Sequence, residues 1–239
     1  MDPPSTVQTA LADRPLDGSV CLEAGAGVGN GTAGLLSAGA NEVYAITNER
    51  DHAAGVRERF AGRNDVAVIE AALEKIPLPD DSVDIVLAHA LFGVVPPAAL
   101  PKIAAELTRV AAPGSHLIVD DYEPLPADSP VRRLFGVENA AAEITTGRPA
   151  LVFYPSRVLE GVFADHGWLT ERKRTLLDPV PWTPELLQAH LDEIRCFSEG
   201  IDDSLAEELI ADGNRLVDEI GSADVGEMYS LAMVLSEQP

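Results

Sequence analysis

The chain has little positive charge, and its few basic residues are scattered. Only 3 of the 17 basic residues are lysines, against 39 Asp and Glu residues, which gives a formal charge of −22. The longest Lys/Arg-rich run is residues 172–174. Because phosphate groups bind clustered positive charge, this composition disfavours nucleic acid and anionic membranes as partners. The acidic excess is spread along the whole chain, so it indicates a negatively charged surface in general and not one particular binding site.

Cysteines and long apolar runs are also scarce. Cys21 and Cys196 lie far apart, and neither belongs to a metal-binding or redox motif, so no metal is expected. We expect both to be buried packing residues in a reducing compartment. No apolar segment reaches about 18 residues, and the first 15 residues lack the pattern of a leader peptide. The sequence therefore predicts a cytoplasmic protein without a membrane-spanning segment.

Short β-rich runs alternate with amphipathic segments from residue 19 onward. The expected strands are 19–23, 42–47, 66–70, 83–88 and 116–121. The expected helices between them are 31–38, 50–61 and 98–110, the last ended by Pro113-Gly114. Parallel neighbouring strands need a crossover connection, which here is a helix. The alternation predicts a doubly wound α/β fold with helices on both faces of the sheet.

The two remaining strands differ in polarity. Residues 168–177 form a strand with a charged middle, which suits the edge of a sheet. Residues 227–235 are apolar on both faces, which suits the interior. The sequence therefore predicts that the last strand lies inside the sheet and that residues 168–177 lie at its edge.

Helical segments flank the charged strand. Helices are expected at 130–145 and 155–166, and two more within 183–220. Of these two, the first begins with Thr183 as N-cap and Pro184, and the second with a capping box of Ser204 and Glu207. We expect one domain spanning residues 1–239, with lid-like helical insertions at about 130–147 and 183–220.

A glycine-rich turn follows the first strand and has the sequence Glu23-Ala-Gly25-Ala-Gly27-Val-Gly29. Glycines at alternate positions allow sharp bends and close approach of a ligand to the backbone, at the strand end where open α/β sheets bind ligands. The dinucleotide pattern fails because Asn30 occupies its third glycine position. Glu23 would repel a pyrophosphate but can pair with an ammonium group. The turn predicts a nucleotide-like ligand that carries an amino group.

This turn resembles the first motif, E/D-x-G-x-G-x-G, of class I S-adenosylmethionine-dependent methyltransferases. Residues 76–86 (IPLPDDSVDIV) and 107–117 (LTRVAAPGSHL) are similar to two later motifs of that family. The resemblance covers roughly residues 15–236. It implies a Rossmann-like, seven-stranded, mostly parallel sheet whose antiparallel last strand is inserted beside the fifth. It also implies S-adenosylmethionine as cofactor.

The resemblance extends to residues that contact the cofactor, with two departures. The family usually ends its second strand with an acid that binds the ribose, where this chain has Thr47, so Asn48 or Glu49 would share that contact. The acid that usually recognises the adenine amine corresponds to Ala72, which leaves backbone groups of Ala72 and Leu73 for that contact. The implied cofactor residues are Glu23, Gly25, Ala26, Gly27, Thr47, Asn48, Glu49, Ala72 and Leu73.

Four residues are candidates for the acceptor side. His89 ends the fourth strand and is either a general base or a structural histidine that packs against the cofactor. Asp120, Asp121 and Tyr122 follow the fifth strand and face the same cleft, and of these Asp121 and Tyr122 are expected to contact the substrate. The chain has neither the N/D-P-P-Y/F motif of amine-directed enzymes nor a Pro-Cys nucleophile for cytosine.

These observations predict a methyltransferase that transfers the methyl group of S-adenosylmethionine to a small organic acceptor. Two alternatives remain open. One is a non-catalytic regulatory or partner protein with the same fold, which Thr47 and Ala72 would permit. The other is an NAD(P)-dependent oxidoreductase, which the glycine spacing and Glu23 disfavour. The sequence leaves the oligomeric state open.

The composition resembles that of proteins from salt-accumulating halophilic archaea. With a net charge of −22, self-repulsion should destabilise the chain in dilute buffer. The Debye length falls from about 10 Å at 0.1 M salt to about 3 Å at 1 M, so added salt screens this repulsion. We therefore expect the thermal unfolding midpoint to rise with KCl. A midpoint that stays flat or falls as KCl increases would remove the basis for this resemblance.

Overall fold

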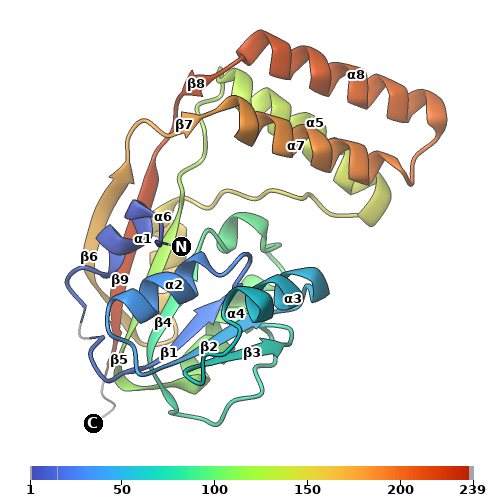
Figure 1. Cartoon of the computed structure of the whole chain (residues 1–239). Helices are drawn as coiled ribbons and strands as arrows, with labels where there is room; N and C mark the ends of the chain where they lie inside the picture. The colour runs from blue at the N-terminus through green and yellow to red at the C-terminus, as the bar shows by residue number, and fades with distance from the viewer. Residues whose placement is uncertain (1, 15, 237–239) are drawn as a thin grey trace.

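The computed structural model describes residues 2–14 and 16–236, and its main feature is a seven-stranded sheet (Figure 1). The strand order is β3-β2-β1-β4-β5-β9-β6. The first five strands pair in parallel, whereas β9 is antiparallel to both β5 and β6. The strands are β1 (Val20–Ala24), β2 (Glu42–Thr47), β3 (Val66–Glu70), β4 (Val83–His89), β5 (Ala111–Tyr122), β6 (Trp168–Leu177) and β9 (Met228–Leu235). The predicted fold class is confirmed.

Helices cover both faces of this sheet. On one face α1 and α2 share an apolar cluster with β1, β2, β4 and β5, and α3 packs beside β2 and β3. On the other face α4 and α6 contribute to the largest apolar cluster. These helices are α1 (Ser5–Leu11), α2 (Asn30–Ser37), α3 (Arg50–Arg59), α4 (Leu100–Val110) and α6 (Ser156–Ala164). In α4 the buried residues Leu100, Ile103 and Leu107 recur at helical spacing, which explains why this segment is a helix with one apolar face.

The polarity argument for the last strands is confirmed. β9 is buried between β5 and β6, and β6 has a partner on one side only.

Two local expectations are wrong. Pro113-Gly114 does not end α4, because α4 ends at Val110 and both residues lie inside β5, near a register irregularity. The helix α8 (Asp203–Ile220) is capped by Asp202, which accepts a hydrogen bond from the backbone N–H of Ser204, so the predicted capping box is not the cap.

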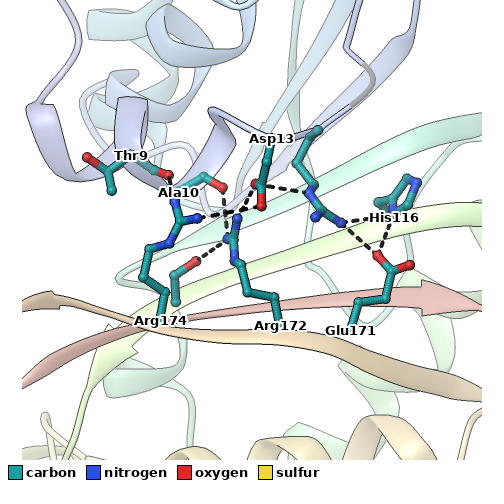
Figure 2. Close-up of polar contacts among 9 residues, drawn as sticks. Thr9, Ala10, Asp13, His116, Glu171, Arg172 and Arg174 are labelled. Atoms are coloured by element: carbon teal, nitrogen blue, oxygen red, sulfur yellow. Dashed lines mark hydrogen bonds and ion pairs between the residues drawn. The ribbon is translucent and has the colours of Figure 1, made fainter.

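The N-terminal helix α1, which the sequence did not predict, is held against β6 by ion pairs (Figure 2). Asp13 pairs with Arg14, Arg172 and Arg174, and Arg14 also donates to Glu171 at 2.7 Å. Although burial opposes it, hydrogen bonds from Arg14 and Arg172 lower the pKa of Asp13 to about 2. The charged side chains of the edge strand therefore attach a helix as well as blocking the edge.

A helical cap stands beyond the sheet at the end where β5 leaves it (Figure 1). It consists of α5 (Pro130–Thr146), α7 (Pro184–Ser198), α8 (Asp203–Ile220) and the small pair β7 (Pro181–Trp182) and β8 (Ala223–Asp224). The three helices pack on one another around a second apolar cluster. Thr183 accepts a hydrogen bond from the N–H of Leu186, which confirms its predicted N-cap role. The expected helical insertions therefore exist, and their function as a lid stays a prediction.

The two cysteines lie in different environments. Cys21 is buried, but Cys196 is exposed on α7, so the expectation that both are packing residues is wrong for Cys196. Within residues 2–14 and 16–236, no helix has the length and apolar character needed to cross a bilayer. The expected single domain of 1–239 includes residues 1, 15 and 237–239, which lie outside the described part of the chain.

Candidate functional site

The glycine-rich loop joins β1 to α2 at the carboxyl end of the sheet. Gly25, Gly27 and Gly29 have φ angles of +74°, +47° and +79°, which side chains other than glycine rarely adopt. A Cβ at Gly25 would lie 2.6 Å from Leu91, and one at Gly29 would lie 2.8 Å from Phe60. A Cβ at Gly27 would meet only a backbone oxygen at 3.9 Å. Gly25 and Gly29 therefore serve packing, whereas Gly27 faces open space.

Glu23 lies beneath this loop and is only 3% exposed. Its carboxylate accepts hydrogen bonds from the N–H groups of Gly31 at 2.8 Å and Thr32 at 2.7 Å, and from the Thr32 hydroxyl. Burial raises the pKa of Glu23 to about 7, although these hydrogen bonds oppose the rise. Glu23 thus binds N–H groups in the first turn of α2 that have no partner within the helix. Its predicted pairing with a ligand ammonium stays a prediction.

Backbone hydrogen bonds bring the loops that follow β1, β2 and β3 to one edge. The N–H of Ala26 donates to Ile46 at 2.8 Å, and the N–H of Ala71 donates to Thr47 at 3.0 Å. The predicted cofactor residues from three strands are therefore neighbours in space. Arg59 adds a contact that nothing in the sequence predicted, because it reaches from α3 to the backbone oxygen of Val28 at 2.6 Å.

The predicted ribose and adenine residues differ in exposure. Thr47 is 4% exposed, and its hydroxyl accepts a hydrogen bond from the N–H of Glu49 at 3.1 Å. Asn48 and Glu49 are exposed, and Glu49 is the N-cap of α3. Leu73 is packed into the main apolar cluster, and Ala72 is exposed beside it. Asn48 and Glu49 thus combine polarity with accessibility, as a ribose contact requires.

His89 is the last residue of β4, and its side chain is 16% exposed. Its Nδ1 lies 3.3 Å from Oδ2 of Asp120, a fully buried residue of β5. The next residue, Ala90, has a φ of +50°, which is unusual for a residue other than glycine. Strained backbone of this kind often occurs at functional sites. The structure therefore adds Asp120 as a partner of the predicted candidate His89.

Asp121 and Tyr122 follow Asp120, but their surroundings differ. Asp121 is 2% exposed and accepts hydrogen bonds from the N–H of Gly93 at 3.1 Å and of Tyr122 at 2.8 Å. Burial raises its pKa to about 6, against these two hydrogen bonds. Tyr122 packs its ring against Phe153 of the segment between α5 and α6. Asp121 thus positions the 3-10 turn η1 (Phe92–Val94), and its contact with substrate stays a prediction.

The two raised carboxyl pKa values predict how stability depends on pH. Glu23 and Asp121 hold protons in the folded chain at pH values where the unfolded chain has released them. Their contribution is fully present below the unfolded pKa of about 4 and is lost as the pH rises through about 6 to 7. In about 1 M KCl, where general repulsion is screened, the unfolding midpoint should be higher at pH 5 than at pH 8. An unchanged midpoint would contradict the burial of these carboxyls.

Two open hollows lie away from this edge. One of about 570 Å³ is lined by residues 41–42 and 63–65. The other, of about 340 Å³, is lined by residues 17–19, 84–85 and 112–116, at the opposite ends of the strands. Neither includes a residue of the glycine-rich loop or the His89–Asp120 pair. Among the described residues, no three metal-ligating side chains gather as a metal site would require.

Comparisons with known proteins agree with this arrangement. Residues 22–119 match a family described as methyltransferase domain. A putative methyltransferase from Bacillus halodurans is similar in structure, with a TM-score of 0.65, 15% identity, and coverage of 98% of this chain and 100% of that chain. A geranyl diphosphate methyltransferase in complex with S-adenosylmethionine gives a TM-score of 0.63 and 16% identity, covering 97% of this chain and 84% of that chain.

Not every neighbour is named as a methyltransferase. A [4+2]-cyclase gives a TM-score of 0.65 and 16% identity, covering 98% of this chain and 81% of that chain. No relative is found among curated protein sequences. Residues 22–119 are similar to the methyltransferase domain family, and the chain shares its fold with solved methyltransferase structures, which confirms the resemblance inferred from its motifs.

Proposed function

We propose that the chain is a methyltransferase that transfers the methyl group of S-adenosylmethionine to a small organic acceptor. The observation that carries this proposal is the open space at Gly27, on a loop where both flanking glycines are closely packed. A Cβ at that position has no close neighbour within the chain, so the surface beside it is free for a ligand that approaches the backbone. The match to a methyltransferase domain supports the same ligand.

The residues at this edge fit S-adenosylmethionine. The exposed Asn48 and Glu49 at the end of β2 offer hydrogen-bond acceptors for ribose hydroxyls. The loop containing Ala72, next to β3, offers backbone groups for the adenine. Because Glu23 already binds the first turn of α2, it shapes the loop, and its carboxyl would lie beneath the amino end of the ligand.

Methyl transfer requires the chain to position the acceptor more than to activate the methyl donor. S-adenosylmethionine supplies a methyl group on a positively charged sulfur, which is already a good leaving group. The chain must therefore orient an acceptor in line with the sulfur–methyl bond and exclude water. His89 ends β4, and its ring lies beside Asp120 of β5. As a general base, His89 would remove a proton from the acceptor.

We also propose that the helical cap covers the acceptor. The cap follows β5 directly, and Tyr122 at the end of β5 contacts Trp182 of the cap. Deleting residues 130–147 would not test this cleanly, because Val131, Leu134 and Phe135 of α5 belong to the core of the cap. Hydrogen exchange is the better measurement: amide exchange in α5 and α7 should slow when S-adenosylhomocysteine and an acceptor are bound. Unchanged exchange would leave the cap with a packing role only.

Calorimetric titration in about 1 M KCl tests the cofactor. We expect S-adenosylmethionine and S-adenosylhomocysteine to bind, and NAD not to bind. Binding of NAD alone would favour the oxidoreductase alternative. Binding of none of the three would favour a regulatory protein with the same fold.

Methyl transfer itself needs a separate experiment, because one structural neighbour of this fold is a [4+2]-cyclase. The chain is incubated with S-adenosylmethionine labelled in the methyl group and, in parallel, with a small-molecule extract or with bulk RNA. We expect label in the small-molecule fraction, because the net charge of −22 opposes nucleic acid. Label in RNA alone would overturn the assignment of a small acceptor.

A further inference from the structure

Asp120 and His89 form a polar pair that the fold itself aligns. The two residues are register partners on the parallel neighbours β4 and β5, so their side chains project from the same face of the sheet. The distance between Nδ1 of His89 and Oδ2 of Asp120 is 3.3 Å. The N–H of Ala90 also donates to the backbone oxygen of Asp120 at 2.7 Å. Side-chain and backbone contacts thus fix the ring of His89 relative to β5.

The burial of Asp120 determines what the imidazole ring must do. Asp120 is fully buried, and its Oδ1 has no hydrogen-bond partner among the described residues. An ionised carboxylate can only accept hydrogen bonds, and a buried one without a donor is costly. With Asp120 ionised, the ring of His89 is the donor, through a proton on Nδ1. In the neutral ring, this leaves the lone pair on Nε2.

Nε2 lies on the other side of the ring from Asp120. It makes no hydrogen bond within the described part of the chain, and the His89 side chain is partly exposed. Glu23 on β1 and Asp121 on β5 are the other titratable groups that interact with His89. The pair is thus arranged to accept a proton at Nε2.

We infer that Asp120 is a positioning residue that holds His89 with Nε2 toward the acceptor, and that the acceptor is a nucleophile that must lose a proton. This inference rests on the proposed methyl transfer. A lone pair on the acceptor atom forms the new bond to the methyl carbon, and the electrons of the sulfur–methyl bond remain on sulfur. The proton leaving the acceptor goes to Nε2, and Asp120 stabilises the resulting imidazolium before the proton passes to water.

This assignment selects a chemical class of acceptor. A hydroxyl or thiol group becomes a better nucleophile as its proton is removed, so a base at the site accelerates its methylation. A neutral amine already has a free lone pair and gains less from a base. The geometry therefore favours a small acceptor with a hydroxyl or thiol group.

The tautomer of His89 can be measured without any acceptor. Nitrogen-15 NMR of the ring distinguishes a proton on Nδ1 from one on Nε2, and His89→Gln identifies the signal among the five histidines. We expect the proton on Nδ1 in the parent chain. Asp120→Ala should shift the proton toward Nε2, whereas the control Asp121→Ala, whose carboxyl binds backbone N–H groups, should not. A proton on Nε2 in the parent chain overturns the inference, even if the variants fail to fold.

Methyl transfer gives the second measurement. A panel of small phenols, thiols and amines is offered with labelled S-adenosylmethionine to the parent chain and to His89→Gln. We expect transfer to a phenol or thiol, with kcat reduced about 100-fold or more in His89→Gln at unchanged KM. Transfer to amines only, unaffected by His89→Gln, overturns the inference but leaves the proposed function intact. Failure of S-adenosylmethionine to bind would instead defeat the proposed function, while the NMR result would still decide the role of Asp120.

Discussion

Replacing Gly27 with valine should abolish tight binding of S-adenosylmethionine while leaving the chain folded. The new side chain meets no atom of the chain closer than 3.9 Å at its Cβ, so it would project into the space assigned to the ligand. We expect affinity to fall by at least about 100-fold, which corresponds to roughly 2.8 kcal/mol. Calorimetric titration in about 1 M KCl measures this loss.

The backbone strain of this change needs its own control. Gly27 has a φ of +47°, so a valine there costs roughly 1–2 kcal/mol whether or not a ligand binds. Gly62 also has a positive φ, of +82°, and a Cβ there would have no atom within 4 Å, but it belongs to the turn after α3. Gly62→Val should therefore cost similar stability and keep the affinity. Equal affinity in both variants would place the ligand elsewhere.

The strand order followed from polarity patterns in the sequence. Charge in the middle of β6 and apolar residues on both faces of β9 placed these strands at the edge and in the interior, as the structure confirms. Such patterns are informative because a strand buried on both faces cannot carry charge without a large desolvation cost. The start of α7 was also predictable, because Thr183 and Pro184 are residue types typical of the start of a helix.

Features that depend on tertiary contacts were not predictable. Helix α1 is short, and its attachment to β6 depends on Asp13 meeting arginines far along the chain. Asp202 and Ser204 are both good N-caps, so their order of preference could not be decided from local sequence. Cys196 is exposed because it lies on the outer side of α7, which depends on how the cap helices pack.

The candidate site also has features that the sequence predicts and features that depend on tertiary structure. The glycine-rich loop was predictable because glycine is strongly favoured where φ is positive, but three glycines with the same pattern have different surroundings. Only the fold shows that Gly25 packs against Leu91 while Gly27 faces open space. The partner of His89 also depends on strand register, because Asp120 is opposite His89 only when β4 and β5 pair as they do. The sequence identified the strand ends, and the register identified the pair.

Gly31→Ala should strongly destabilise the fold at the start of α2. A Cβ at Gly31 would overlap Oε1 of Glu23 and lie 3.0 Å from Leu87. Because both neighbours are buried in the sheet, the Glu23 carboxylate would have to leave the first turn of α2. It would lose hydrogen bonds worth roughly 1.5–3 kcal/mol each and remain buried. We expect a net loss of about 2–4 kcal/mol in the free energy of unfolding.

The same substitution in α3 provides the matched control. Gly55 lies inside α3, and a Cβ there would have no atom within 4 Å. Since alanine is a better helix former than glycine, Gly55→Ala should stabilise the chain by roughly 0.5–1 kcal/mol. At about 2–4 °C per kcal/mol for a chain of this size, the two variants should shift the thermal midpoint in opposite directions. If Gly31→Ala raised the midpoint as Gly55→Ala does, Glu23 could not be the residue that holds the start of α2, and the glycine-rich loop would owe its shape to Leu91 and Phe60 alone.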